Sequence, residues 1–287
     1  ELEAVQLGRE LKELALWYGE AARPGHRRAV LLPEGATLEA GEAGPEVAIE
    51  RAAVVLDPAR RTAGGRIFDP ADCAPPWDTC LALARRARAA VIKAAPGLDH
   101  ALAGSDVELE AVQLGRELKE LTLWYGEGAR PGHRRAVLLP EGATLEAGEA
   151  VPGVGIGAPG RYLFDPESCV TRAGLVRELA ARLGAWQLDA RVAYLSSDRP
   201  AFDPLAATFE VLEAMPFSAN RLRGWLREHR FRPGEIRRRA FPVEPEELRR
   251  LLGRLEGEPV TLLCTTLGGE RLVFAARRLG PAGGERG

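Results

Sequence analysis

Hydrophobic and polar positions between residues 52 and 97 predict a strand, a helix and a second strand. "AAVVLD" (52–57) has no polar alternation, which is typical of a strand buried on both faces of a sheet. "PPWDTCLALARRARA" (75–89) predicts an amphipathic helix that begins after two prolines, which the first helical turn tolerates. "AAVIKAAPG" (89–97) predicts a second buried strand. We therefore expect two parallel strands whose carboxyl ends lie at one edge of a sheet, where α/β proteins bind ligands.

From about residue 161 the pattern changes to short strands and helices in alternation. A helix is predicted over 168–183, followed by a strand at "RVAYLSS" (191–197). The later elements are predicted in the order strand, helix, strand, helix and hairpin: 209–217, 219–229, 234–242, 245–257, 259–267 and 270–279. The order β-α-β-α-β-β predicts a ferredoxin-like α+β sandwich with its helices on one face.

The chain repeats a long segment of itself. Residues 1–43 recur at 108–150, and only two positions differ: Ala15 against Thr122 and Ala21 against Gly128. Solenoid repeats have shorter periods and drift in sequence, so this pair indicates a duplication or rearrangement. The repeated pattern fits one helical face, and it equally fits two strands around a Gly115-Arg116 turn; periodicity leaves both open.

Composition is ordinary for a folded protein, with 46% hydrophobic and 28% charged residues and a formal net charge of -2. No apolar stretch reaches the length of a membrane span and no signal peptide opens the chain, so we expect a cytoplasmic protein. The chain begins at Glu1 and its only methionine is Met215, which predicts a trimmed or partial chain. Four cysteines, without any C-x-x-C spacing, predict buried reduced thiols and no metal site: Cys73, Cys80, Cys169 and Cys264.

The first candidate for chemistry is Asp57-Pro58-Ala59-Arg60-Arg61, which directly follows the predicted strand. Its carboxylate can accept hydrogen bonds from a planar amine or a base edge at the sheet edge. Arg60 and Arg61 can bind phosphate or carboxylate with two parallel hydrogen bonds. The alternative is that Asp57 caps a turn and that both arginines are merely solvated.

The second candidate is the arginine-rich segment 221–239. Its arginines, set against Glu228 and Glu235, are Arg221, Arg223, Arg227, Arg230, Arg232, Arg237, Arg238 and Arg239. Eight arginines minus two glutamates leave a local charge of +6, and Trp225 and Phe231 are interleaved. This pattern suits contacts with the phosphates of a nucleic acid, although a solvated helix face explains it equally well.

The motif "GIGAPG" (155–160) matches G-x-G-x-x-G, which in dinucleotide-binding proteins follows a strand and opens a helix. The segment before it, "EAGEAVPGV", does not read as a strand, and the segment after it, "RYLFDPES", does not read as a helix. We therefore expect a linker here. A nucleotide-dependent oxidoreductase is retained only as a third hypothesis. No Ser-His-Asp order, H-E-x-x-H motif or G-K-[ST] loop is present.

A set of segments together resembles one family, the class I S-adenosylmethionine-dependent methyltransferases with a C-terminal THUMP-like domain. These segments are "VVLDPARR" (54–61), "FDPADCAPPW" (68–77), "AAVIKAAPGLDHAL" (89–102), "LKELTLWYG" (118–126), "RRAVLLPEGATL" (134–145), "GRYLFDPE" (160–167), "FEVLEAMPF" (209–217) and "EIRRRAF" (235–241). The resemblance implies an α/β fold: a partial Rossmann-like methyltransferase sheet followed by a ferredoxin-like α+β THUMP-like domain. It also implies that 108–126 is the antiparallel hairpin that closes the sheet.

The resemblance further implies functional roles. Asp57, Pro58 and Arg60 would form the catalytic position. Substrate binding would fall to Arg61, Lys93, Arg221, Arg223, Arg237, Arg238 and Arg239. The methyl donor would be S-adenosylmethionine and the partner RNA, with no membrane and no metal involved.

The implied domains are a duplicated copy (1–50), the C-terminal half of a methyltransferase-like domain (51–152), a glycine-rich linker (153–160), the THUMP-like domain (161–279) and a disordered tail (280–287). The family's donor-binding loop precedes the Asp57 segment, and residues 1–50 contain no such glycine-rich loop. We therefore expect this chain to bind the donor weakly and to be inactive by itself. The alternative function is a non-catalytic RNA-binding module built on the THUMP-like domain.

Overall fold

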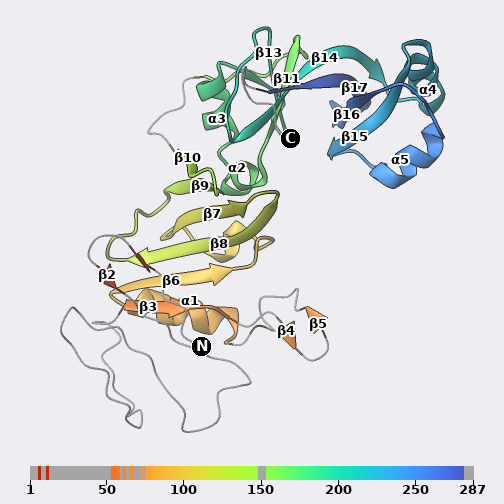
Figure 1. The fold of residues 1–287 in the computed structure, drawn as a ribbon. Helices are drawn as coiled ribbons and strands as arrows, with labels where there is room; N and C mark the ends of the chain where they lie inside the picture. Colours follow the sequence, from red (N-terminus) through yellow and green to blue (C-terminus); the bar gives the residue numbers. More distant parts are fainter. Residues whose placement is uncertain are drawn as a thin grey trace. The chain divides into compact units, whose positions relative to one another are not determined.

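The computed structural model describes residues 53–58, 73, 75–147 and 153–280, and elsewhere only the backbone of four two-residue strands (Figure 1). These are β1 (Gln6–Leu7), β2 (Leu11–Lys12), β4 (Arg61–Thr62) and β5 (Gly65–Arg66). The chain divides into two compact units, Glu1–Pro140 and Glu141–Gly287. Apart from β1 and β2, the first repeat copy lies outside the described residues, as does the predicted tail beyond residue 280.

The first unit contains the predicted strand-helix-strand unit and the predicted hairpin. Its main elements are β3 (Ala53–Leu56), α1 (Trp77–Arg86), β6 (Ala89–Ala94), β7 (Glu108–Leu114), β8 (Glu117–Gly126) and β9 (Arg134–Leu139). The strands lie in the order β9-β7-β8-β6-β3. β3 is parallel to β6, with Leu56 opposite Ile92, and β8 is antiparallel to both β6 and β7. The prediction of two parallel strands is confirmed.

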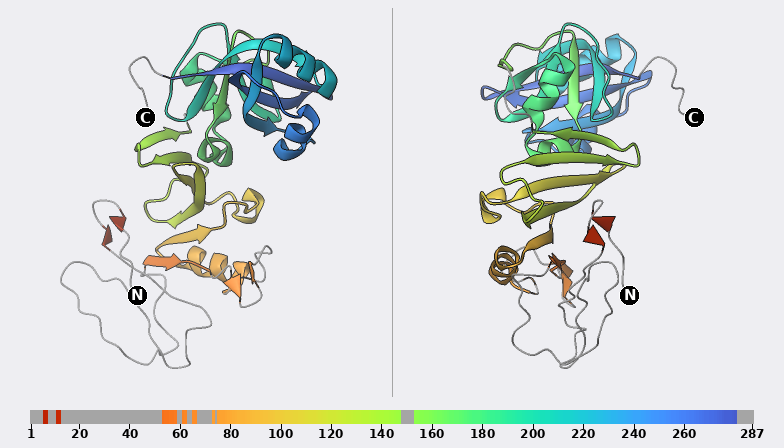
Figure 2. Two further views of the ribbon diagram at one scale, coloured as in Figure 1. Left: turned by 45° about the vertical axis from the view of Figure 1, so that its right-hand side comes forward. Right: turned by 90° about the vertical axis from the view of Figure 1, so that its left-hand side faces the viewer.

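Burial explains the apolar pattern of these strands. Leu56, Ile92 and Leu123 are buried in the sheet, and α1 covers one face of β3 and β6 (Figures 1 and 2). The indole N–H of Trp77, at the start of α1, donates to the carbonyl of Leu102 at 3.0 Å. This bond fixes the helix against the loop that follows β6, where a short 3₁₀ helix covers His100–Leu102.

The second repeat copy forms strands and not a helix. β7 and β8 flank a two-residue turn at Gly115 and Arg116, and Gly115 has a φ of 57°, which glycine adopts easily. β9 pairs with β7 in parallel, a pairing that the sequence pattern did not predict. The structure thus settles the ambiguity of the repeat for residues 108–126.

The second unit is built on one long sheet. Its elements are β10 (Ala143–Glu146), β11 (Tyr162–Pro166), α2 (Ser168–Ala173), α3 (Val176–Leu183), β12 (Trp186–Asp189), β13 (Val192–Ser197), β14 (Ala206–Pro216), α4 (Ala219–Glu228), β15 (Phe231–Arg239), α5 (Pro245–Leu252), β16 (Glu258–Leu267) and β17 (Glu270–Leu279). The strand order is β12-β13-β11-β14-β17-β16-β15, and β15 is parallel to β16 while the other neighbours are antiparallel. The predicted β-α-β-α-β-β order is present, and β11, β13 and β12 extend its sheet.

The single helix predicted over 168–183 is wrong. α2 ends at Gly174, whose φ of 71° is left-handed, and α3 begins two residues later at Val176. A glycine in this conformation ends a helix because it satisfies the last carbonyl groups without a steric penalty. Strand β12, which follows α3, was also not predicted.

Two buried clusters occupy the two faces of the second sheet. Helices α4 and α5 lie together beside β15 and bury Leu222, Leu226, Leu248 and Leu252 against one face (Figure 1). The opposite face buries a second cluster that includes Leu163, Tyr194, Phe209 and Phe274. β15 approaches β13, although β11, β14, β17 and β16 stand between them in the strand order. The sheet therefore curves around the second cluster.

All four cysteines lie among the described residues, are buried and form no disulfide, which confirms the prediction of buried reduced thiols. Burial raises the pKa of Cys80 to about 11 and those of Cys169 and Cys264 to about 12. Within the described residues, no helix is long and apolar enough to cross a membrane. The same residues contain no group of three or more His, Cys, Asp or Glu side chains that could hold a metal ion.

Candidate functional site

Asp57 lies at the carboxyl edge of the parallel pair β3 and β6. It directly follows Leu56, the last residue of β3, and its side chain is 46% exposed. Pro58 after it is buried, whereas Asp57 itself is exposed at the end of the strand. The structure therefore places Asp57 where the sequence predicted it, while its catalytic role stays a prediction.

Lys93 brings a positive charge to the same edge. Its ammonium nitrogen lies 3.7 Å from Oδ2 of Asp57 and 3.2 Å from Oε2 of Glu120 on β8. The hydroxyl of Thr122 donates to Oε1 of Glu120 at 3.4 Å. The sequence did not predict Glu120 as a site residue. It lies near Lys93 only because β6 and β8 pair in the register that sets Lys93 opposite Thr122.

This edge can recognise a polar group that presents an N–H or O–H. The carboxylates of Asp57 and Glu120 are acceptors, and Lys93 orients them without being buried itself, since its side chain is 42% exposed. Of the other predicted site residues nearby, Arg60 lies outside the described residues, and only the backbone of Arg61 is described, in β4.

The described part of this edge does not form a pocket for the implied donor. β3 is followed by Asp57 and Pro58, and β6 is followed by Ala95, Pro96 and Gly97. A Cβ added at Gly97 would meet nothing within 4 Å, so the space beside this glycine is open. The described residues of the first unit thus supply one wall of a site but no glycine-rich cradle for a nucleoside.

Two of the predicted RNA-binding arginines pair with a buried acid. Nη1 of Arg237 lies 2.7 Å from Oδ2 of Asp165, and Nε of Arg239 lies 2.6 Å from Oδ1 of the same carboxylate. Their side chains are only 22% and 24% exposed, and that of Asp165 is 7% exposed. Burial by itself would lower the pKa of Arg237, but the hydrogen bond and charge of Asp165 outweigh it and raise that pKa.

The aromatic rings of the second cluster lie under these guanidinium groups. The guanidinium carbon of Arg237 is 5.5 Å from the ring centre of Phe209, and that of Arg239 is 5.7 Å from the ring centre of Tyr194. Burial raises the pKa of Tyr194 well above its ordinary value, with Asp165 adding to the effect. This arrangement stabilises the curved sheet and leaves little of either guanidinium for a ligand.

The other predicted arginines lie elsewhere. Arg238 faces away from Asp165, and its guanidinium donates to the carbonyl of Phe241 at 3.0 Å and pairs with Glu244. Arg221 is exposed at the start of α4, whereas Arg223 is half-buried. The structure therefore does not bring the five predicted arginines of this segment together into one surface.

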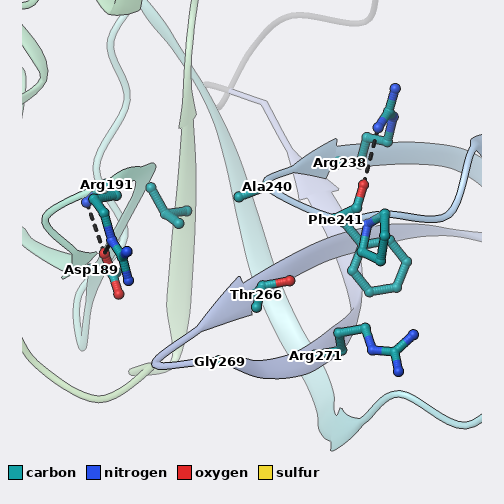
Figure 3. A pocket seen from close by; sticks show the side chains of 10 residues that line it. Asp189, Arg191, Arg238, Ala240, Phe241, Thr266, Gly269 and Arg271 are labelled. Carbon is teal, nitrogen blue, oxygen red and sulfur yellow. Dashed lines mark hydrogen bonds and ion pairs between the residues drawn. The ribbon is translucent and has the colours of Figure 1, made fainter.

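Arg238 also lines a hollow of about 760 Å³ in the second unit (Figure 3). Asp189 and Arg191, from the β12–β13 turn, lie on one side of it, and Arg238 and Phe241 lie on the other. The backbone N–H of Arg191 donates to Asp189 at 2.8 Å and lowers the pKa of that carboxyl. The lowered pKa keeps Asp189 charged, and the lining also contains Arg191, Arg238 and Arg271, so positive charge is in excess and suits an anionic group.

Two glycines of "GIGAPG", Gly157 and Gly160, serve packing. Gly157 donates its N–H to the carbonyl of Gln187 at 3.0 Å, and a Cβ added to it would lie 2.8 Å from Cδ1 of Trp186. The indole N–H of Trp186 donates to the carbonyl of Ala158 at 2.8 Å. Strand β11 follows the motif, where a dinucleotide fold would have a helix, so the arrangement does not support the oxidoreductase hypothesis.

Comparison with known proteins identifies the relatives of this chain. The THUMP domain-like family model matches residues 206–278. Two Mycobacterium tuberculosis proteins, from strains CDC 1551 / Oshkosh and ATCC 25618 / H37Rv, are both named "Uncharacterized S-adenosylmethionine-dependent methyltransferase". Each is 38% identical to this chain over 222 residues, which cover 76% of this chain and 61% of the relative. The chain is a homologue of S-adenosylmethionine-dependent methyltransferases and carries a THUMP-like domain.

A solved structure agrees with this relationship. The crystal structure of a "putative methyltransferase" from Porphyromonas gingivalis W83 matches with a TM-score of 0.63 and 26% sequence identity, covering 79% of this chain and 60% of that chain. The predicted family resemblance and fold class are confirmed. This methyltransferase homologue spans about 61% of the length of the two Mycobacterium proteins, and the predicted domain boundaries stay predictions.

Proposed function

We propose that this chain is part of an enzyme that transfers a methyl group from S-adenosylmethionine to RNA in the cytoplasm. Its homology to proteins named as S-adenosylmethionine-dependent methyltransferases supports the donor. The observation that carries the proposal is Asp57, a carboxylate at the carboxyl edge of a parallel strand pair, with Lys93 3.7 Å away. The THUMP-like domain supports RNA as the acceptor.

S-adenosylmethionine, when bound, supplies a methyl group on a positively charged sulfur. In this proposal the carboxylate of Asp57 accepts a hydrogen bond from the nucleotide group that is to be methylated and orients it. Lys93 holds the carboxylate in place from one side, and Glu120 holds Lys93. Such positioning is the main protein contribution to a transfer in which the donor is already reactive.

The predicted RNA-binding residues divide into two groups in this proposal. Arg221, Arg223 and Arg238 remain candidates for contacts with RNA phosphates. Arg237 and Arg239 stabilise the domain through Asp165, because both guanidinium groups already bind a buried carboxylate. Removing either of these two would therefore weaken RNA binding only through loss of the fold.

The test uses the 287-residue chain, labelled S-adenosylmethionine and total RNA. Because the sequence predicts weak donor binding, we expect label to enter RNA only slowly and only at a large excess of donor, and Asp57→Asn should remove this transfer without changing RNA affinity. Asp78→Asn is the matched control, since Asp78 is an exposed acid in the first turn of α1 and should leave the rate unchanged.

Other outcomes separate the rival functions. RNA binding without any binding of S-adenosylmethionine by calorimetry would replace this proposal with the non-catalytic RNA-binding module. An Asp57→Asn variant with unchanged transfer would show that the carboxylate caps a turn and that the active site lies elsewhere.

A further inference from the structure

Three rings stack where α4 meets β15. The ring centres of Trp225 and His229 are 4.4 Å apart with planes 24° apart, and those of Trp225 and Phe231 are 5.7 Å apart with planes 25° apart. Nδ1 of His229 lies 2.9 Å from the carbonyl oxygen of Trp225, which holds the imidazole in its stacked orientation. A sequence-based reading notices Trp225 and Phe231 but assigns no role to His229.

Two rings of the stack pack against the hydrophobic core, and the third is accessible to solvent. Trp225 and Phe231 are partly buried against the cluster that α4 and α5 cover. His229 is exposed. An exposed ring that stacks on a core-anchored indole is a preformed platform, because little conformational entropy remains to be lost when a further ring is added.

The turn that presents His229 is also fixed. Arg230 has a φ of 54°, a left-handed conformation that side chains other than glycine rarely adopt. Its carbonyl accepts a hydrogen bond from the N–H of Glu258 at 3.0 Å, and a Cβ added at Gly257 would lie only 1.8 Å from that carbonyl oxygen. Backbone in such a conformation is strained and persists only where the surrounding contacts hold it.

Positive charge surrounds the platform. Arg227, Arg230 and Arg232 are exposed, and within the described residues no ion pair engages any of them. Glu228 and Glu258, the latter at the start of the neighbouring strand β16, are nearby acids, so three arginines and two glutamates leave a local charge of +1. Exposed guanidinium groups beside stacked rings are the combination with which proteins bind single-stranded nucleic acids.

We propose that this surface, formed by Trp225, His229 and Phe231 with Arg227, Arg230 and Arg232, binds unpaired RNA. One base stacks on the His229 ring, and the arginines contact the neighbouring phosphates. A base inside a duplex has no open face, so the surface selects single-stranded segments of the substrate. This inference rests on the proposed function for the choice of RNA and adds the requirement that the bound segment be unpaired.

The test measures fluorescence anisotropy of a labelled twelve-nucleotide oligouridine, and of a labelled RNA duplex, with the full chain. His229→Ala should weaken binding of the single strand between about 5- and 100-fold and leave duplex binding unchanged. His229→Phe, which keeps a ring, should retain most of the affinity. Circular dichroism of each variant checks that the fold is kept.

Salt dependence tests the arginines. Replacing Arg227, Arg230 and Arg232 with Gln should reduce the slope of log affinity against log salt for the single strand by up to about two units. Arg254→Gln, at an exposed arginine beyond α5, is the matched control and should not change the slope by a measurable amount.

Two results would overturn the inference in different ways. If the chain binds RNA but His229→Ala leaves single-strand affinity unchanged, RNA lies elsewhere and the proposed function survives without this surface. If the wild-type chain binds neither RNA, the choice of RNA as substrate fails, and this surface with it.

Discussion

Nε of Arg239 lies 2.6 Å from Oδ1 of Asp165, although their strands β15 and β11 are separated in the sheet by β16, β17 and β14. Arg237 reaches the other oxygen of the same carboxylate at 2.7 Å. The two ion pairs thus join strands that have no backbone hydrogen bonds to each other. Because Asp165 is buried, the two guanidinium groups replace the water that its carboxylate would otherwise bind.

Asp165→Asn should lower the free energy of unfolding of the second unit by about 3 kcal/mol, because two guanidinium groups lose their only shared carboxylate. Urea denaturation of the full chain measures this loss. Glu210→Gln is the control, since Glu210 pairs with two arginines that are 66% and 60% exposed and should cost less than about 1 kcal/mol. Equal losses in the two variants would mean that the curved sheet does not depend on Asp165.

Acid should weaken the first unit through Glu108. Burial alone would raise the pKa of this carboxyl, but hydrogen bonds from Arg130 and the charges of Arg130 and Arg135 outweigh burial and lower it. Because the pKa is lower in the folded state, Glu108 stabilises the fold fully at pH values above its unfolded-state pKa of about 4.3. This stabilisation is lost as the pH falls through the folded-state pKa.

Measuring the free energy of unfolding of wild type and Glu108→Gln at several pH values tests whether acid removes this stabilisation. The variant should be less stable by about 1 kcal/mol at pH 7, a modest figure because Arg130 is half exposed, and the difference should shrink below about pH 4. A difference that stays constant between pH 7 and pH 3 would contradict the assigned role of Arg130.

Gly128→Ala should destabilise the first unit by about 1–2 kcal/mol, because Gly128 has a φ of 86°, where an L side chain is strained. The first repeat copy carries Ala21 at the corresponding position, so this variant makes the two copies identical at that position. Thermal unfolding measures the change. Gly97→Ala, at a glycine with open space around it, should have a much smaller effect.

Gly157→Ala should disturb the second unit, since the added methyl group would lie 2.8 Å from the Trp186 indole. We expect a shift of tryptophan fluorescence and a lower melting temperature. Gly155→Ala should be neutral, because a Cβ there meets nothing within 4 Å. If both glycines mattered equally, the motif would have a role other than packing against Trp186.

The sequence pattern predicted those elements whose formation depends on residues close together in the chain. The buried strand before Asp57 and the helix after Pro76 were predictable, because each depends on side chains a few positions apart. The pattern left the hairpin at Gly115 open, and only the family resemblance implied it. The helix over 168–183 failed for a local reason as well, since Gly174 was read as part of the helix although it ends α2.

Partners that are distant in sequence were not predictable. Glu120 reaches the Asp57 edge only because β6 and β8 pair in one particular register. Arg237 and Arg239 point toward Asp165, which lies 72 and 74 residues earlier in the chain. A run of arginines does not indicate which side chains face the interior. The structure was needed to separate the buried, paired arginines from the exposed ones.

The charge balance at the Asp57 edge has a consequence for how a polyanion can approach it. Within the described residues, Asp57 and Glu120 share the single ammonium group of Lys93, which leaves one negative charge in excess. These two carboxylates would repel a phosphodiester, whereas they would admit an uncharged heterocycle or a cation. In the proposed function they therefore face the nucleobase, and positively charged residues outside this pair bind the sugar-phosphate chain.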